Sequence, residues 1–376
     1  MPVIFATDAL IFLLLAVALG FAVYVRRHAH LREPWRRVAC SPLAMGSVVV
    51  IAVYVAIGLL DSLHYHPRLE SATEQRGGGY SNEVLSVFDL LVAALRQRVE
   101  KTYSAPFATH LYAKETVELA DGSITRAYPR LIYGGAHLSD PQRQQRADVA
   151  VSALHYAFFA LTLWLICCAL LVGWRVSRLG RGFLSEAARV LRGETRVPLR
   201  TMLLTFGVLL LIAIVAGGLS LKYHILGTDK VGQDVFYQTL KSIRTGLVIG
   251  TLTTLVMLPF AVLLGIMAGY FRGWIDDVIQ YLYTTLNSIP GVLLIAAAVL
   301  MLQVHMNTHA DQFNSLAERA DLRLLFLCMI LGVTSWTGLC RLLRGETFKL
   351  RELDYITAAR ALGVSHRSII TRHILP

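Results

Sequence analysis

Charged residues are scarce in this chain of 376 residues: they make up 16% of it, whereas hydrophobic residues make up 55%. Seven runs hold no Lys or Arg, and each is about long enough to cross ~30 Å of hydrocarbon as a helix. This pattern excludes an ordinary soluble domain and predicts an all-α polytopic membrane protein of about seven transmembrane helices. The runs are Ala9–Val25, Leu43–Leu60, Val149–Trp174, Thr201–Leu221, Gly246–Tyr270, Gln280–Leu302 and Leu324–Cys340.

Several chemical signatures are also missing. The chain has no G-x-x-x-x-G-K-[ST] motif, so it is not expected to bind ATP through a P-loop, and no set of nucleophile, base and orienting residue indicates an enzyme. None of the five cysteines falls between residues 61 and 148, so no disulfide framework is expected there. His305 and His309 lie four residues apart near Asp311, but without a second ligating element they predict no metal site. The first apolar run lacks the features of a cleavable signal peptide and is expected to be a permanent anchor.

The positive charge lies in particular loops. The formal net charge is +11, and arginines crowd the loops Arg26–Pro42 and Arg175–Arg200, whereas Asp61–Asp148 is nearly balanced. Because basic short loops stay on the cytoplasmic side, the pattern predicts a multi-pass membrane protein with the N-terminus and Asp61–Asp148 outside and residue 376 in the cytoplasm. The expected partner of these basic loops is therefore the lipid bilayer, and no nucleic acid partner is expected.

The chain divides near residue 200 into four predicted parts. Residues 1–60 hold two transmembrane helices and a basic cytoplasmic loop, and residues 61–148 form a small α+β extracytoplasmic insert. Residues 149–200 hold the third transmembrane helix and an arginine-rich linker, and residues 201–376 follow with four spans. In the insert, Ser81–Tyr103 has helical apolar spacing, Tyr112–Tyr128 resembles a hairpin around Asp121-Gly122, and Ser139-Asp140-Pro141 starts a helix.

The linker segment Gly182–Arg192 places apolar residues on one helical face and arginines on the other. This predicts an amphipathic helix against anionic headgroups, and a solvated connector is the alternative.

The last stretch of the chain places small residues ahead of a glycine and a closing proline. It reads Tyr-Ile-Thr-Ala-Ala-Arg-Ala-Leu-Gly over residues 355–363, and the chain ends on His-Ile-Leu-Pro. Small side chains permit close docking, and the glycine permits a sharp turn between two short helices. The pattern resembles the cytoplasmic coupling loop of bacterial ABC-transporter permeases, with a threonine where the family usually has glutamate. The candidate residues are Thr357, Ala358, Ala359, Gly363, His373, Leu375 and Pro376.

Three further patches carry the same resemblance, in order, over residues 222–376. His224–Asp234 is similar to the His-Pro-Leu-Gly-Thr-Asp segment of dipeptide, oligopeptide and nickel permeases, and Gly265–Asp276 is similar to their Gly-x-x-x-Gly-Tyr segment. Pro290 stands at their proline in the following span. The first 200 residues do not share the resemblance. The extracytoplasmic motif residues are Leu226, Gly227, Thr228, Asp229, Gly232 and Asp234.

The resemblance implies a binding-protein-dependent ABC importer permease of the bacterial inner (cytoplasmic) membrane, for peptides or a related small solute, with nickel as one possibility. Such a subunit pairs with a second permease, cytoplasmic ABC ATPase subunits and an extracytoplasmic solute-binding protein; ATP is bound by the ATPases and this chain carries no cofactor. The family core has six spans with the coupling loop between the fourth and fifth, so two core spans are expected after Pro376 and truncation is favoured. The alternatives are a membrane sensor with an external domain and a non-functional permease fragment.

Small residues and prolines in the spans indicate packing and movement. Gly246 with Gly250, and Gly265 with Gly269, form two G-x-x-x-G pairs on one span, which lets helix backbones approach closely. Pro259 between them predicts a kink, and Pro290 belongs to the same group of candidate packing or gating residues. Static packing of this helix is the alternative to a rearranging pathway lining.

Overall fold

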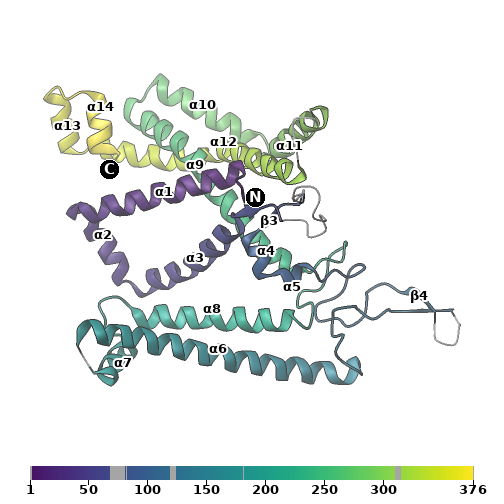
Figure 1. The fold of residues 1–376 in the computed structure, drawn as a ribbon. Coiled ribbons are helices and arrows are strands. Elements are labelled where there is room, and N and C mark those ends of the chain that lie inside the picture. Colours follow the sequence, from purple (N-terminus) through teal and green to yellow (C-terminus); the bar gives the residue numbers. More distant parts are fainter. Residues whose placement is uncertain are drawn as a thin grey trace, which may run out of the picture. The chain divides into compact units, whose positions relative to one another are not determined.

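The computed structural model describes residues 2–67, 81, 83–118, 124–180, 182–309 and 315–375. Helices dominate it, and the strands are short, so the predicted all-α polytopic fold is confirmed (Figure 1). Its helices are α1 (Ala6–Arg27), α2 (Ala29–Cys40), α3 (Pro42–Asp61), α4 (Val87–Leu91), α5 (Ala93–Arg96), α6 (Pro141–Leu179), α7 (Phe183–Arg192), α8 (Leu199–Ser220), α9 (Val235–Phe271), α10 (Trp274–Ser288), α11 (Gly291–Thr308), α12 (Leu316–Arg351), α13 (Asp354–Ala361), α14 (His366–Ile369) and the π-helix η2 (Ile370–Ile374). The strands are β1 (Pro2–Val3), β2 (His64–Tyr65), β3 (Leu85–Ser86), β4 (Glu115–Glu118) and β5 (Ile124–Ala127).

Seven of the described helices are long and apolar enough to cross a membrane: α1, α3, α6, α8, α9, α11 and α12. One predicted span is wrong, because Gln280–Leu302 is not a continuous helix. α10 ends at Ser288, Ile289 is extended (φ −86°, ψ 125°), and α11 begins after Pro290. Proline has no N–H to donate and excludes the preceding residue from the helical region, so it separates the two helices.

The described chain forms two compact units. One comprises residues 18–65 and 85–244, and the other comprises residues 1–17, 66–84 and 245–376. Helices α1 and α9 each contribute residues to both. The division near residue 200 expected from the sequence does not coincide with this boundary, since α8 belongs to the same unit as α3 and α6.

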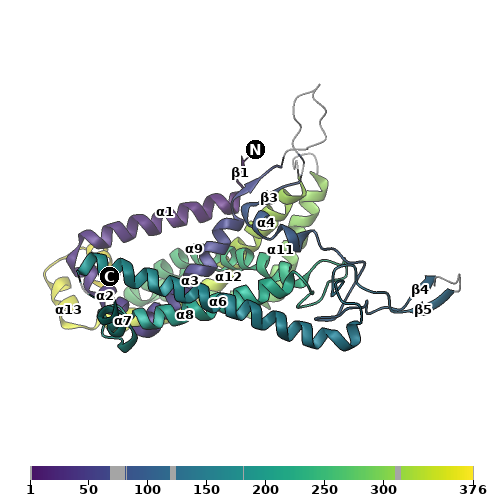
Figure 2. The same cartoon turned by 60° about the horizontal axis from the view of Figure 1, so that its bottom comes forward.

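The pairing of α8 with α6 rests on two glycines of α8. A Cβ at Gly207 would lie 2.6 Å from Nε1 of Trp164, and one at Gly218 would lie 2.5 Å from the ring of Tyr156. Trp164 also donates its indole N–H to the carbonyl of Leu203 at 2.8 Å. The glycines therefore provide the room in which aromatic rings of α6 pack, and the two helices lie side by side in both views (Figures 1 and 2).

The helix start predicted at residues 139–141 is confirmed. Asp140 is the N-cap of α6, Pro141 occupies its first turn, and the helix continues without a break into the third span before ending at Gly180 (φ 65°). The amphipathic segment is also a helix, α7. Its buried Glu186 pairs with Arg175 of α6 at 2.8 Å, which fastens α7 to the end of α6.

The structure of the insert agrees in part with the elements predicted from the sequence. β4 and β5 pair antiparallel from Glu115↔Ala127 to Glu118↔Ile124, so the hairpin is confirmed, while Asp121-Gly122 lies outside the described residues. The helix expected over Ser81–Tyr103 is not continuous. Ser86 forms a capping box with Asp89, so helix begins only at Val87, and Val92 (φ −108°) separates α4 from α5.

In the other unit, α9 packs against α12 through the second glycine pair. A Cβ at Gly265 would lie 2.8 Å from Leu343 Cβ, and one at Gly269 would lie 2.5 Å from Thr347 Cβ. Among the described residues, no atom lies within 4 Å of a Cβ at Gly246 or Gly250. Among the described residues, therefore, the second G-x-x-x-G pair forms a close helix contact and the first does not. α9 is a single helix through Pro259, and the predicted kink there stays a prediction.

This difference makes a prediction about stability. Gly269→Ala should destabilise the protein by about 1–3 kcal/mol, because the added methyl group overlaps Thr347 and the backbone of Arg344. Gly250→Ala, on the same helix, should be neutral or slightly stabilising, because alanine favours helix and meets open space. Thermal unfolding of both variants in detergent measures the difference. Equal melting temperatures for the two variants would contradict the assigned α9–α12 contact.

Candidate functional site

The C-terminal motif folds as two short helices joined by a left-handed glycine, as expected. α13 ends with hydrogen bonds from Leu362 N–H to the Ala358 carbonyl and from Val364 N–H to the Ala359 carbonyl. Gly363 has φ 76°, a conformation that glycine adopts without steric cost. The hydroxyl of Ser365 then accepts from Ser368 N–H and caps α14. The reversal of direction at Gly363 is therefore fixed by local chemistry.

A buried cluster ties this helical hairpin to the transmembrane helices. Ile356 of α13, Ile369 of α14 and Ile374 of η2 are buried against Ile266 and Tyr270, near the end of α9. The hydroxyl and the backbone carbonyl of Tyr270 also make polar contacts.

The Tyr270 hydroxyl lies 2.7 Å from His366 Nδ1, and Arg351, at the end of α12, donates to the Tyr270 carbonyl at 2.9 Å. The cluster and these hydrogen bonds therefore join α9, α12 and the hairpin to one another.

An ion pair also holds the C-terminal part of α12. Arg344 donates from Nε and Nη2 to the two carboxylate oxygens of Asp276 at 2.6 and 2.7 Å. The hydrogen bonds from Arg344 hold the pKa of Asp276 below its usual value despite partial burial. Asp276 stands in the first turn of α10, so α10 is fastened to the helix that carries the hairpin.

The outer face of the hairpin is exposed and partly apolar. Leu362 is 83% exposed and Tyr355 is 49% exposed. Among the residues predicted from the sequence, Thr357, Ala358, Gly363, His373 and Leu375 are exposed, whereas Ala359 packs against the buried cluster and Pro376 lies outside the described residues.

Leu362 and Tyr355 were not among the predicted residues. For Leu362, the signal available in the sequence was a large apolar side chain directly before the turn glycine. Exposed apolar side chains beside small residues form a surface of the kind that protein partners cover.

The motif Leu226–Asp234 forms a second candidate site together with residues of the insert, and this pair of segments is called the clasp. Glu100 N–H donates to the Gly232 carbonyl at 2.8 Å, and the Thr228 hydroxyl donates to the Thr102 carbonyl at 2.8 Å. Gly227 (φ 77°) and Gly232 (φ 81°) lie so close to the backbone of Ser104 and Glu100 that a Cβ at either glycine would overlap a carbonyl oxygen.

The two aspartates of the motif shape its backbone. The Asp229 carboxylate accepts from the N–H groups of Val231 and Gln233 at 2.9 and 2.8 Å. Burial acts to raise the pKa of Asp229, but hydrogen bonds from the Gln238 amide and from the backbone outweigh it and lower the pKa. Asp234 accepts from Phe236 N–H at 2.7 Å and so caps the start of α9. Leu226 is 43% exposed.

A buried histidine lies between two carboxylates at the centre of the clasp. His224 Nδ1 is 2.7 Å from Asp234 and Nε2 is 3.3 Å from Glu100, and all three side chains are buried. Burial acts to lower the pKa of His224, but the hydrogen bonds to the two carboxylates outweigh it and raise the pKa to about 9. Glu100 also accepts from the N–H groups of Ile132 and Tyr133. Glu100 was not predicted from the sequence, because nothing local marks a residue whose partners lie far along the chain.

The raised pKa of His224 predicts that the protein loses stability at alkaline pH. The charged His224 contributes fully below its unfolded pKa of 6.5, and the contribution is lost as pH rises through about 9. The pKa of Glu100 is lowered: burial opposes this, but hydrogen bonds from His224 and the backbone outweigh it, so its contribution is lost on the acid side. We expect the melting temperature to fall between pH 7 and pH 10. His224→Gln should start lower and lose less over this range, whereas parallel curves for the two proteins would contradict the assignment.

The hairpin falls in a region that matches known transporters. A family model for the binding-protein-dependent transport system inner membrane component matches residues 261–376. The oligopeptide transport system permease protein OppC of Mycobacterium tuberculosis is 32% identical over 153 residues, which are 41% of this chain and 47% of the relative. The glutathione transport system permease protein GsiD of Pectobacterium atrosepticum is 32% identical over 153 residues, or 45% of its length. The dipeptide transport system permease protein DppC of Bacillus subtilis is 26% identical over 153 residues, or 42% of its length.

The resemblance predicted from the sequence motifs is therefore confirmed: residues 261–376 match the model of the binding-protein-dependent transport system inner membrane component, and the similar relatives are permease proteins. The chain spans about half the length of the curated relatives it matches.

Proposed function

We propose that this chain is a permease subunit of an ABC importer, a transporter component and not an enzyme, and that its α13–α14 hairpin docks on a cytoplasmic ATPase. The observation that supports this best is the hairpin itself. Its inner face is anchored by Ile356 and Ile369 on α9, and its outer face exposes Tyr355 and Leu362 beside small residues. An element held firmly to membrane helices on one face and open on the other is suited to pass motion between two proteins.

Coupling in this proposal is mechanical. ATP is bound by the partner ATPases, and this chain supplies no cofactor. When the ATPases approach each other, the docked hairpin is displaced, and the buried cluster around Tyr270 transfers the displacement to α9 and α12. Tight packing supports such transfer, because closely packed interiors move as units.

The transported solutes we propose are peptides or related small molecules, in line with the names of the relatives, which mention oligopeptides, dipeptides and glutathione but not nickel. The further partners are a second permease subunit, which completes the pathway, and an extracytoplasmic solute-binding protein. The orientation is the one predicted from the arginine loops: the N-terminus and the insert outside, and the hairpin in the cytoplasm.

A photo-crosslinking amino acid placed at single positions tests docking and orientation together. At Leu362, in cells that express the chain with candidate ATPase subunits, it should give an adduct that mass spectrometry identifies as an ATPase. At Tyr112, which is 78% exposed in the insert, it should give no ATPase adduct. ATPase adducts from Tyr112, or none from Leu362 when other hairpin positions also fail, would refute the proposed docking surface.

A further inference from the structure

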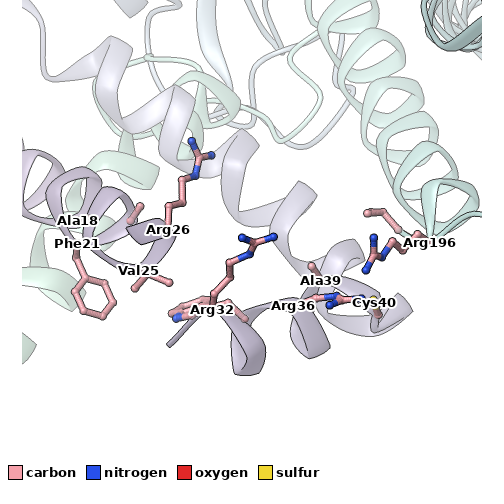
Figure 3. A pocket seen from close by; sticks show the side chains of 12 residues that line it. Ala18, Phe21, Val25, Arg26, Arg32, Arg36, Ala39, Cys40 and Arg196 are labelled. Atoms are coloured by element: carbon pink, nitrogen blue, oxygen red, sulfur yellow. The ribbon is translucent and has the colours of Figure 1, made fainter. Parts of the chain in front are cut away.

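A cavity of about 720 Å³ lies where α1 ends, within the unit that holds α2 and α8. Its walls come from the last turns of α1, from α2 and from the segment just before α8, including Arg196 and Val197. Figure 3 shows Phe21 and Val25 at one end, Arg36, Cys40 and Arg196 at the other, and Arg26 and Arg32 between them. The volume is that of a site for a small organic molecule.

One part of the wall is apolar. Phe21 and Val25 lie on the membrane-spanning helix α1, and Trp35 lies on α2. Tryptophan is enriched where hydrocarbon meets water, because its ring is apolar and its N–H is polar. The apolar part therefore lies at the boundary of the bilayer, where the span of α1 ends.

The other part of the wall is cationic. Four arginines line it: Arg26, Arg32, Arg36 and Arg196. Arg36 has a distant ion pair of 3.7 Å with Glu33, and within the part of the chain that the structure describes no carboxylate pairs with the other three. Four guanidinium groups around one space repel each other unless an anion lies among them, and guanidinium matches phosphate oxygens in geometry.

We propose that this cavity binds an anionic phospholipid, with its phosphate among the four arginines and an acyl chain along Phe21 and Val25. A soluble anion would satisfy the arginines but not the apolar wall, and an apolar molecule would leave the arginines uncompensated. An anionic lipid satisfies both, and the position at the end of a membrane span gives it direct access from the bilayer. The bound lipid joins the end of α1 and α2 to the start of α8.

Cys40 lines the cavity and is an exposed free cysteine, so it reports on occupancy. The purified protein is placed in nanodiscs of phosphatidylcholine alone or with phosphatidylglycerol, and alkylation of Cys40 by a water-soluble maleimide is followed by peptide mass spectrometry. Phosphatidylglycerol should slow alkylation of Cys40. Arg32→Gln with Arg196→Gln should weaken the protection about 25-fold, at about fivefold for each arginine.

Two control variants make the result specific. Arg192→Gln with Arg200→Gln removes the same charge from exposed arginines of the same linker outside the cavity and should keep the protection. Arg32→Lys with Arg196→Lys keeps the charge and should retain most of it, which separates lost binding from lost folding.

Three outcomes would overturn the proposal. They are equal alkylation in both lipids, protection by inorganic phosphate in nanodiscs of phosphatidylcholine alone, and loss of protection in the Arg192/Arg200 control.

Discussion

Replacing Gly363 by valine is expected to weaken ATPase binding by about tenfold or more and to uncouple transport from ATP hydrolysis. Gly363 has φ 76°, which costs an L-residue roughly 1–2 kcal/mol and a β-branched residue more. Since 1.4 kcal/mol corresponds to a factor of ten, the strain alone is large enough to shift the hairpin out of its docking conformation. Co-purification of ATPase subunits and ATP-dependent uptake of a peptide measure the two effects.

The structure supplies a sharper control than the sequence did. No described atom lies within 4 Å of a Cβ at Gly363, so the effect of valine comes from backbone conformation within this chain. Asparagine tolerates the left-handed region, and Gly363→Asn should therefore keep most of the binding. Thr357→Glu, at an exposed position, restores the residue usual in the resembled family and should preserve or strengthen binding. If valine binds as well as asparagine, the turn at Gly363 has no part in docking.

Replacing Gly232 by alanine is expected to destabilise the protein by about 2–5 kcal/mol and to release the insert from the start of α9. The alanine methyl group would overlap the carbonyl of Glu100, and φ 81° adds strain. Both effects act on Gly232, whose carbonyl accepts from Glu100 N–H. The clasp is therefore disrupted, and the contact between Glu100 and the buried His224 is misaligned. The measurements are thermal unfolding and the rate of limited proteolysis between residues 98 and 135.

Gly193 is the matched control for this change. It also has a positive φ, 75°, but no described atom lies near its Cβ position, so Gly193→Ala should cost only the strain of about 1–2 kcal/mol. The proteolysis of the insert should stay unchanged in Gly193→Ala. Equal losses in the two variants would mean that the close approach of Gly232 to Glu100 contributes nothing.

Some properties follow from local sequence patterns alone. Apolar runs set most of the spans, because a helix in hydrocarbon must satisfy its backbone internally and present apolar side chains. The left-handed turn at Gly363, the α6 start at Pro141 and the β4–β5 hairpin follow from residues adjacent in the chain. The break between α10 and α11 also has a local cause, which is Pro290. The sequence prediction nevertheless continued one span through this proline.

Other properties depend on contacts between residues far apart in sequence. The two glycine pairs of α9 have the same sequence spacing, yet in the part of the chain that the structure describes Gly265 and Gly269 contact α12, whereas no atom lies near Gly246 or Gly250. Ala358 and Ala359 are neighbours, but one is exposed and the other packs on the buried cluster, because adjacent helical positions point in different directions. Glu100 meets His224 across 124 positions of the chain. The sequence therefore determined most of the spans, the turn at Gly363 and the family that the last part resembles, while the tertiary structure decided which faces meet, since that depends on the packing of specific side chains from distant segments.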